Sequence, residues 1–350
     1  TLDLVVDHFF FDMRRHPWAV RSILERYRRE FSYSDRWGLT FQHDMGVANT
    51  FATSGHSAYE LPKRQGCFSF MCQEELVNWI LAAVLYTKLS NDIDWLHDQR
   101  KTMDQCMASL IARDNTDKRH SIGLMQHDSD RCEGGWEITT YDSMDFCLGR
   151  ACGNLYLGVK TWAAWLALEW HYELWEQPEA AQKVRSYAQR AHDTLCASFN
   201  SQTGIFPAQL DGACGGAVLP AVEGLIFPWY LAGKRMLADD YPYAKLIQLL
   251  RQHAQTVLQS RCRFKDGGWK LSESAENSWL SKIYLSQAII SGILGYSDPQ
   301  EKQADLAHQS WLLDEENSVF AWSDQMRAGK VCGSRNYPRG VTATLWLELE

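Results

Sequence analysis

The stretch CQEELVNWILAAVLYTK, residues 72–88, carries apolar side chains on every side of a helix rather than along one stripe. The stretch after it, residues 91–113, begins at a capping Asn91 or Asp92 and has apolar residues on one face. That face consists of Ile93, Leu96, Met103, Met107 and Leu110. A helix that is apolar all round must be covered on all sides, and a helix with one stripe can cover it. The two stretches therefore predict an inner helix packed against an outer helix.

The same two-part unit recurs along the chain. An all-round apolar segment is followed by a striped one at 3–15 and 16–31, 150–175 and 177–199, 220–238 and 240–260, and 277–296 and 298–313. One further apolar segment, GVTATLWLE at 340–348, completes the series. Five pairs and a last inner helix fit an all-α fold, an (α/α)6 toroid whose sixth outer helix is not found in this chain. A helical bundle or solenoid needs the same alternation, so periodicity alone leaves both open.

The bulk composition limits the classes of function. The 350 residues carry a formal net charge of -8, which argues against nucleic acid and anionic membrane surfaces as partners. No apolar run approaches the roughly 18 residues that a membrane span needs. The opening TLDLVVDHFFF has acids where a signal peptide is uncharged. The ten cysteines form no CxxC pair, so we expect reduced, mostly buried thiols in a cytoplasmic protein.

Five long loops, each after an outer helix and before an inner one, would gather on one rim of a toroid. They are 32–71, 114–146, 200–219, 261–276 and 314–339. Loops held by a rigid scaffold are where function concentrates. These loops mix acids, amides, glycines and the indoles of Trp37, Trp136, Trp269 and Trp322. Sugar rings pack on indoles and sugar hydroxyls bind acids and amides, so the loops indicate a sugar site.

In the stretch CEGGWEITTYDSMD, residues 132–145, the three acids Glu137, Asp142 and Asp145 follow the tryptophan and precede an inner helix. Hydrolysis of a glycosidic bond needs one carboxylic acid and a second carboxylate. Asp142 is the best candidate for one of them, since alternation along an extended EITTY would point it to the same side as Thr140. The other interpretation is a helix N-cap, for which Asp145 has the stronger claim. Glu137 would bind a sugar hydroxyl or pair with an arginine.

Two further candidates come from other segments. His43 and Asp44 could form a general base with the group that orients it, although such neighbours are usually structural. Glu223 is an acid in an apolar setting, so either a raised pKa or an ordinary place in a first helical turn is open. No GxSxG, HExxH or Walker-type motif occurs, and GACGG at 212–216 lacks the flanking strand and lysine of a phosphate loop.

Seven segments point to one family. They read FxHDMGVAN, EITTYDSxD, NLYLxxKxWAA, PAxEGLxFP, DGGWKLS with NSWLSKIYL, WSDQ, and YPRGVT with LWLE, in order along the chain. This chain resembles the catalytic domain of glycoside hydrolase family 52, the β-xylosidases, from Thr1 to Glu350. The resemblance implies a single (α/α)6 domain over 1–350 and retaining, exo-acting hydrolysis that releases xylose from xylo-oligosaccharides or xylosides. It implies no cofactor and no metal.

The resemblance also assigns residues. It implies that Asp142 is the acid/base and that the nucleophile is a glutamate upstream of Thr1, where a β-sandwich domain is also expected. The chain would then be a piece of a longer protein, with little or no turnover alone. Loop position and chemistry select the residues expected to hold the sugar, which are His43, Asp44, Glu223, Trp269, Lys270 and Arg339. A β-glucosidase of a related family, a sugar-binding fragment without turnover, and a homodimer are left open.

Overall fold

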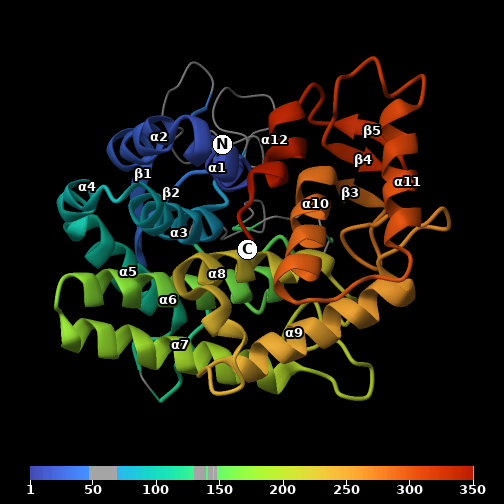
Figure 1. The fold of residues 1–350 in the computed structure, drawn as a ribbon. Coiled ribbons are helices and arrows are strands. Elements are labelled where there is room, and N and C mark those ends of the chain that lie inside the picture. The colour runs from blue at the N-terminus through green and yellow to red at the C-terminus, as the bar shows by residue number, and fades with distance from the viewer. Residues whose placement is uncertain (47–68, 118, 130–138, 141–144, 146–147, 350) are drawn as a thin grey trace.

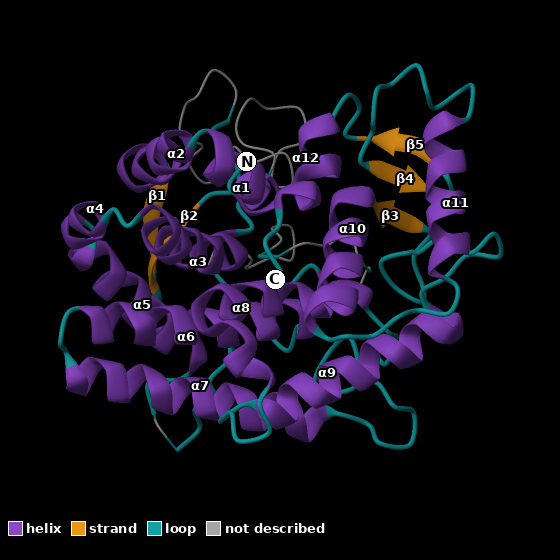
Figure 2. Ribbon diagram, in the orientation of Figure 1, coloured by secondary structure: helices purple, strands orange, loops and turns teal. Residues whose placement is uncertain are grey.

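The computed structural model describes residues 1–46, 69–117, 119–129, 139–140, 145 and 148–349, and helices dominate these ranges (Figures 1 and 2). Two helices are buried on nearly every side. In α3 (Cys72–Ser90) every residue from Cys72 to Thr87 is buried, and in α6 (Leu155–Leu174) every residue from Leu155 to Leu168. Both were predicted as inner helices from their all-round apolar sequence, and this burial confirms the prediction.

The inner elements contact one another in a closed order. Helix α1 (Asp3–Arg15) contacts α3, α3 contacts α6, and α6 contacts the 3-10 helix η5 (Leu219–Leu225). In turn η5 contacts α10 (Leu280–Ala288), α10 contacts α12 (Pro338–Thr342), and α12 returns to α1. The predicted all-α class is confirmed, and the (α/α)6 toroid stays a prediction.

The outer helices bury one stripe each. Helix α2 (Pro17–Glu30) buries Val20, Leu24 and Tyr27 beside α1 and α3. Helix α7 (Pro178–Ser198) lies along α6, while α9 (Ala244–Thr256) continues into a π-helical turn, Val257–Arg261 (Figure 1). Helix α11 (Glu301–Leu313) buries Trp311 and lies beside the strands described below.

The predicted helices over 91–113 and 220–238 are each divided in the structure. The segment 91–113 forms α4 (Ile93–Asp98) and α5 (Arg100–Asp114), and Asp92 is its cap, since its Oδ1 accepts from the amide of Trp95 at 3.2 Å. The segment 220–238 divides into η5, α8 (Ile226–Ala232) and the 3-10 helix η6 (Gly233–Leu237). Pro228 has no amide proton to continue the ladder from η5, which explains the first division.

Helix α6 begins later than predicted. Its N-cap is Asn154, whose Oδ1 accepts from the amide of Leu157 at 2.9 Å. Asp145, predicted as the stronger cap, lies ten positions before the helix and instead accepts from Ser272 Oγ at 2.9 Å. A cap must stand next to the first turn, so the cap interpretation of Asp145 is wrong.

Two small sheets occupy segments predicted as loops. Strands β1 (Ser32–Asp35) and β2 (Gly38–Phe41) pair antiparallel. A three-stranded antiparallel sheet has the order β3 (Asn277–Trp279), β4 (Gln325–Arg327), β5 (Lys330–Gly333), so β3 starts where a helix was predicted. The 289–293 segment is a π-helical turn, and a 3-10 turn, Ala343–Trp346, follows α12.

Within the described ranges, no helix has the length and apolar character needed to cross a membrane. Six of the described cysteines carry free thiols, four of them at least partly buried. Cys214 is disulfide-bonded, so the expectation of reduced thiols is wrong at this residue. Disulfide geometry depends on the separation of Cα atoms in the fold, which the spacing of scattered cysteines along the chain does not reveal.

Candidate active site

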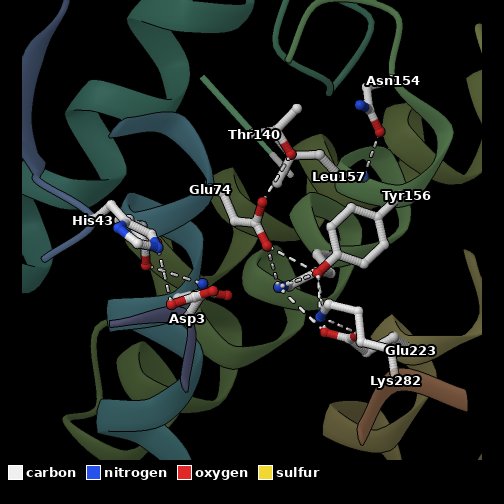
Figure 3. Close-up of polar contacts among 12 residues, drawn as sticks. Asp3, His43, Glu74, Thr140, Asn154, Tyr156, Leu157, Glu223 and Lys282 are labelled. Atoms are coloured by element: carbon white, nitrogen blue, oxygen red, sulfur yellow. Dashed lines mark hydrogen bonds and ion pairs between the residues drawn. The ribbon is translucent and has the colours of Figure 1, made fainter. Parts of the chain in front are cut away.

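Charged and polar side chains from four inner elements meet in one buried group (Figure 3). Glu74 lies in the first turn of α3, Tyr156 and Lys160 lie near the start of α6, Glu223 lies in η5 and Lys282 lies in α10. We call these five residues the central charge cluster. All of them are buried.

The hydroxyl of Tyr156 is the common contact of the central charge cluster. It lies 2.8 Å from Glu74 Oε1 and 3.1 Å from Glu223 Oε1. The ammonium groups of Lys160 and Lys282 donate to it from 3.1 Å and 3.2 Å. A phenol has one proton and two lone pairs, so it can accept from both lysines while donating to one carboxylate.

The charges of the cluster balance, with two carboxylates and two ammonium groups. Lys282 Nζ lies 2.9 Å from Glu223 Oε2, and Lys160 Nζ lies 3.4 Å from Glu223 Oε1 and 3.2 Å from Glu74 Oε1. Burial by itself would raise the pKa of Glu223, but Lys282 and Lys160 outweigh it and the pKa is lowered. The raised pKa that the apolar sequence around Glu223 allowed is therefore wrong. The sequence does not show that two lysines lie beside this carboxylate.

Glu74 also reaches the segment that carries the predicted acid. Its Oε2 accepts from Thr140 Oγ1 at 2.9 Å, and its backbone amide donates to the carbonyl of Thr139 at 3.1 Å. Both threonines are buried and lie in bends, not in the extended backbone expected there. Asp142 and Glu137 lie outside the described residues, so the role of Asp142 stays a prediction.

A second buried polar group surrounds the predicted His43 and Asp44. His43 Nδ1 lies 2.8 Å from Asp44 Oδ2, and His43 Nε2 lies 3.4 Å from Asp3 Oδ1 (Figure 3). Burial would lower the pKa of His43, but Asp3 and Asp44 outweigh it and raise the pKa to about 10. His43 is therefore an imidazolium at neutral pH, which suits a hydrogen-bond donor better than the general base that the sequence left open.

Glu75 faces the same group. Burial and the neighbouring carboxylate of Asp3 raise its pKa well above the ordinary value. Ligand atoms of Asp3, His43 and Glu75 lie within 4.8 Å of one another, which by atom type alone could hold a metal ion. A protonated imidazole has no lone pair to offer, and its charge already compensates the carboxylates. A metal ion at this donor set would therefore have to displace the proton of His43.

The other three predicted sugar ligands lie apart from the central charge cluster. Trp269 is only 2% exposed, and its backbone amide donates to His308 Nε2 at 2.9 Å, a placement that favours packing. Lys270 donates to the carbonyl of Glu273 at 2.7 Å. Arg339 is half-exposed, 3.5 Å from Asp12 and over the ring of Phe11.

Sequence reasoning did not select Asp3, Glu74, Glu75, Tyr156, Lys160 or Lys282. A signal was present for three of them. Glu74 and Lys160 lie in helices that are apolar on every side, and Lys282 lies in the apolar run WLSKIYL. Charged residues are almost never fully buried unless they are paired. A charge on an inner helix therefore predicts an opposite charge on a neighbouring inner helix.

Comparisons with known proteins agree with the resemblance drawn from the sequence motifs. Residues 1–86 match the family model described as Glycosyl hydrolase family 52. A protein named Beta-xylosidase from Geobacillus stearothermophilus is 43% identical over 361 residues, which is 99% of this chain and 51% of that protein. Residues 1–86 are therefore similar to that family, and 99% of the chain is similar to about half of a Beta-xylosidase. A second Beta-xylosidase from the same organism is 37% identical over 180 residues, covering 48% of this chain and 29% of the relative.

The chain spans about half the length of the first of these relatives. The part that matches the family model, residues 1–86, includes the four acids Asp3, Asp44, Glu74 and Glu75 and the imidazole of His43. The second buried group and the Glu74 side of the central charge cluster thus come from the segment matched by the family-52 model.

Proposed function

We propose that this chain carries the acid/base half of a retaining, exo-acting β-xylosidase, a glycosidase that releases xylose from xylo-oligosaccharides. The observation that supports the proposal most is the 43% identity to a named Beta-xylosidase along 99% of the chain. The buried acids, imidazolium and tyrosine at the inner helices supply the hydrogen-bonding groups that sugar hydroxyls need.

In the proposed mechanism Asp142 is the general acid and later the general base. It gives its proton to the leaving oxygen while a carboxylate attacks the anomeric carbon, so the glycosidic bond breaks as an ester bond forms. Asp142 then removes a proton from water, which attacks the same carbon and releases xylose. We assign the attack to a glutamate upstream of Thr1, on the strength of the family resemblance.

The described residues would hold the sugar in this proposal. His43 as an imidazolium would donate to a hydroxyl, and the carboxylates of Asp44 and Glu223 would accept from others. Three further residues remain proposed contacts, namely Trp269, Lys270 and Arg339. To contact the sugar, their side chains would have to move from the positions described above. Single substitutions of these six residues that leave KM for an aryl xyloside unchanged would remove them from the site.

The proposal is tested with Asp142→Ala and two substrates. Xylobiose has a poor leaving group and needs protonation, whereas 2,4-dinitrophenyl β-xyloside needs little. We expect kcat/KM to fall at least about 100-fold for xylobiose and far less for the dinitrophenyl xyloside. Asp117→Ala, which removes an exposed acid paired with Arg119, is the control and should leave both rates unchanged. Equal losses for both substrates would remove Asp142 from the acid/base role.

A second experiment separates the alternatives. The chain alone and a form extended upstream are assayed with 4-nitrophenyl β-xyloside and 4-nitrophenyl β-glucoside. Turnover of xyloside by the extended form only supports the upstream nucleophile, and preference for glucoside favours a β-glucosidase. Saturable xylose binding without turnover by either form favours a sugar-binding protein.

A further inference from the structure

The first turn of α3 is joined to the segment 139–140 by two hydrogen bonds of one residue. The amide of Glu74 donates to the carbonyl of Thr139 at 3.1 Å, and its Oε2 accepts from Thr140 Oγ1 at 2.9 Å. The first amides of a helix have no partner within the helix, so the amide of Glu74 is available for this contact. Backbone and side chain thus bind adjacent residues of the same segment.

The carboxylate of Glu74 is fixed from its other side. Its Oε1 accepts from Tyr156 Oη at 2.8 Å and from Lys160 Nζ at 3.2 Å. Glu223 contacts both of these groups, and Lys282 contacts Glu223 and Tyr156 (Figure 3). The two oxygens of Glu74 therefore have separate partners, one within the central charge cluster and one on Thr140. Because both oxygens are hydrogen-bonded within a buried site, the carboxylate has little freedom to rotate.

Thr139 ties the same segment to the approach to α6. Its amide donates to the carbonyl of Gly149 at 2.9 Å, and its Oγ1 donates to Asp128 Oδ1 at 3.0 Å. The amide of Ala151 in turn donates to Thr139 Oγ1 at 2.8 Å. Thr139 is thus hydrogen-bonded to Gly149, Asp128 and Ala151, whereas Thr140 Oγ1 connects the segment to the central charge cluster. Asp142 follows two positions later.

We propose that Glu74 is a positioning residue for the acid, acting through Thr140. The Glu74–Thr140 hydrogen bond fixes Thr140 to the central charge cluster, and Asp142 follows two positions later in the chain. The inference rests on the proposed function, in which Asp142 protonates the leaving group. General acid catalysis requires the proton donor within hydrogen-bond reach of the leaving oxygen, so a loosened segment lowers the rate where protonation is needed.

The test replaces the hydroxyl that Glu74 holds. Thr140→Val removes the hydroxyl and keeps the shape of the side chain, and Thr140→Ser keeps the hydroxyl and serves as the matched control. In the full-length protein, we expect Thr140→Val to lower kcat/KM at least about tenfold for xylobiose and less than about threefold for 2,4-dinitrophenyl β-xyloside. Thr140→Ser should stay within about threefold of the unsubstituted protein on both substrates.

Two further readouts distinguish positioning from simple stability. The basic limb of the pH profile of kcat/KM reports the proton donor, so it should shift in Thr140→Val and return in Thr140→Ser. Hydrogen exchange in the peptide containing 139–150 should rise in Thr140→Val, with α9 unchanged. A loss for xylobiose that Thr140→Ser does not restore, or equal losses on both substrates, would overturn the proposal.

Asp142→Ala in the same assays separates the two levels of inference. If Asp142→Ala is selectively slow on xylobiose and Thr140→Val is not, Asp142 remains the acid and the positioning role of Glu74 is wrong. If Asp142→Ala shows no selective loss, the proposed acid itself is wrong. The hydrogen-exchange measurement needs no turnover, so unchanged exchange in Thr140→Val contradicts the positioning role even then.

Discussion

At the scale of single residues, the central charge cluster is a set of ions that stabilise one another only as a whole. Lys282 and Glu223 are at most 4% exposed, so neither charge has water to replace a lost partner. Removing one member of a buried ion pair costs roughly 3–5 kcal/mol, because the other charge stays buried and unpaired. The ion pair matters for stability mainly because breaking it is costly. It matters less as a source of stability beyond what apolar side chains in its place would provide.

Lys282→Met tests this cost directly. It should lower the free energy of unfolding by about 3–5 kcal/mol, since Glu223 then keeps Lys160 as its one ammonium partner among the described residues. Urea unfolding followed by tryptophan fluorescence measures the change. Lys330→Met, which removes an exposed ammonium paired with Asp314 and Glu316, is the control and should have little effect. Similar losses in both variants would contradict the description of the cluster.

His253 gives a pH-dependent prediction. Its Nδ1 accepts from the amide of Phe206 at 3.1 Å and its Nε2 lies 2.9 Å from the carbonyl of Val218, so the neutral ring satisfies both contacts. Burial lowers its pKa to about 4, from 6.5. As pH falls below 6.5, the unfolded chain binds a proton that the native chain does not, and stability is lost through this window.

The expected loss from His253 between pH 7.5 and pH 4.5 is about 2.5 kcal/mol. His253→Gln retains an acceptor and a donor and has no proton to gain, so its unfolding free energy should fall by that much less over the same range. Urea titrations of both proteins at the two pH values measure the difference. Parallel falls would show that His253 is not the group responsible.

At the scale of elements, the loop after α5 is built into the contact of α6 with α7. Gly123 has φ +77° and its carbonyl accepts from Trp165 Nε1 at 2.8 Å. A Cβ at Gly123 would lie 2.3 Å from the amide nitrogen of Ala191 in α7, where nothing can move without shifting the helix. Backbone of this kind needs glycine for space as well as for its φ angle.

Gly123→Ala should therefore cost more than the roughly 1–2 kcal/mol of the left-handed conformation alone. Gly212→Ala is the matched control, because Gly212 has φ +80° and nothing within 4 Å of the Cβ position. Thermal unfolding of the two variants compares strain plus collision with strain alone. Equal melting temperatures would mean that α7 yields to the added methyl group.

Sequence periodicity predicted the elements where one face or all faces are apolar over several turns. It found α3 and α7 nearly to the residue, because their burial follows the chain directly. It missed the strands β3, β4 and β5, which have three or four residues each and little alternation to detect. It also missed the breaks in 220–238, where proline and glycine decide the backbone locally.

The candidate site was predicted less well than the helices. His43, Asp44 and Glu223 were selected and lie in buried polar groups, but their partners come from elements distant in the chain. Tyr156 and Lys160 had been assigned only to the inner segment 150–175 because their contacts with Glu74 and Glu223 span more than 60 positions. No local pattern shows which side chains of neighbouring inner helices meet.

At the scale of the whole molecule, the two largest apolar clusters of the described chain are very unequal in size. The large core runs from Leu2 to Ala304 and includes most of the buried apolar side chains of α3 and α6. A smaller cluster around Trp311 and Met326 joins α11, β4 and the start of α10. Regions with fewer buried apolar contacts open at lower free energy than the main core.

Native-state hydrogen exchange should therefore show earlier opening of α11, β4 and β5 than of α3 and α6. The amides of β4 and β5 should exchange together, since they share one small sheet. Peptides from 72–90 and 155–174 should exchange only with global unfolding. Simultaneous exchange of both regions would mean that the smaller cluster unfolds with the core.

The pairing of Glu74 and Glu223 with Lys160 and Lys282 among the described residues also has an evolutionary consequence. A single charge change in this set leaves a buried charge without one of its partners, and selection for folding would remove most such chains. Divergent relatives should therefore keep all four charges or lose them in opposite pairs. Substitutions at these positions would therefore occur in pairs. A charged residue on one inner element would be replaced only together with its oppositely charged partner on a neighbouring element.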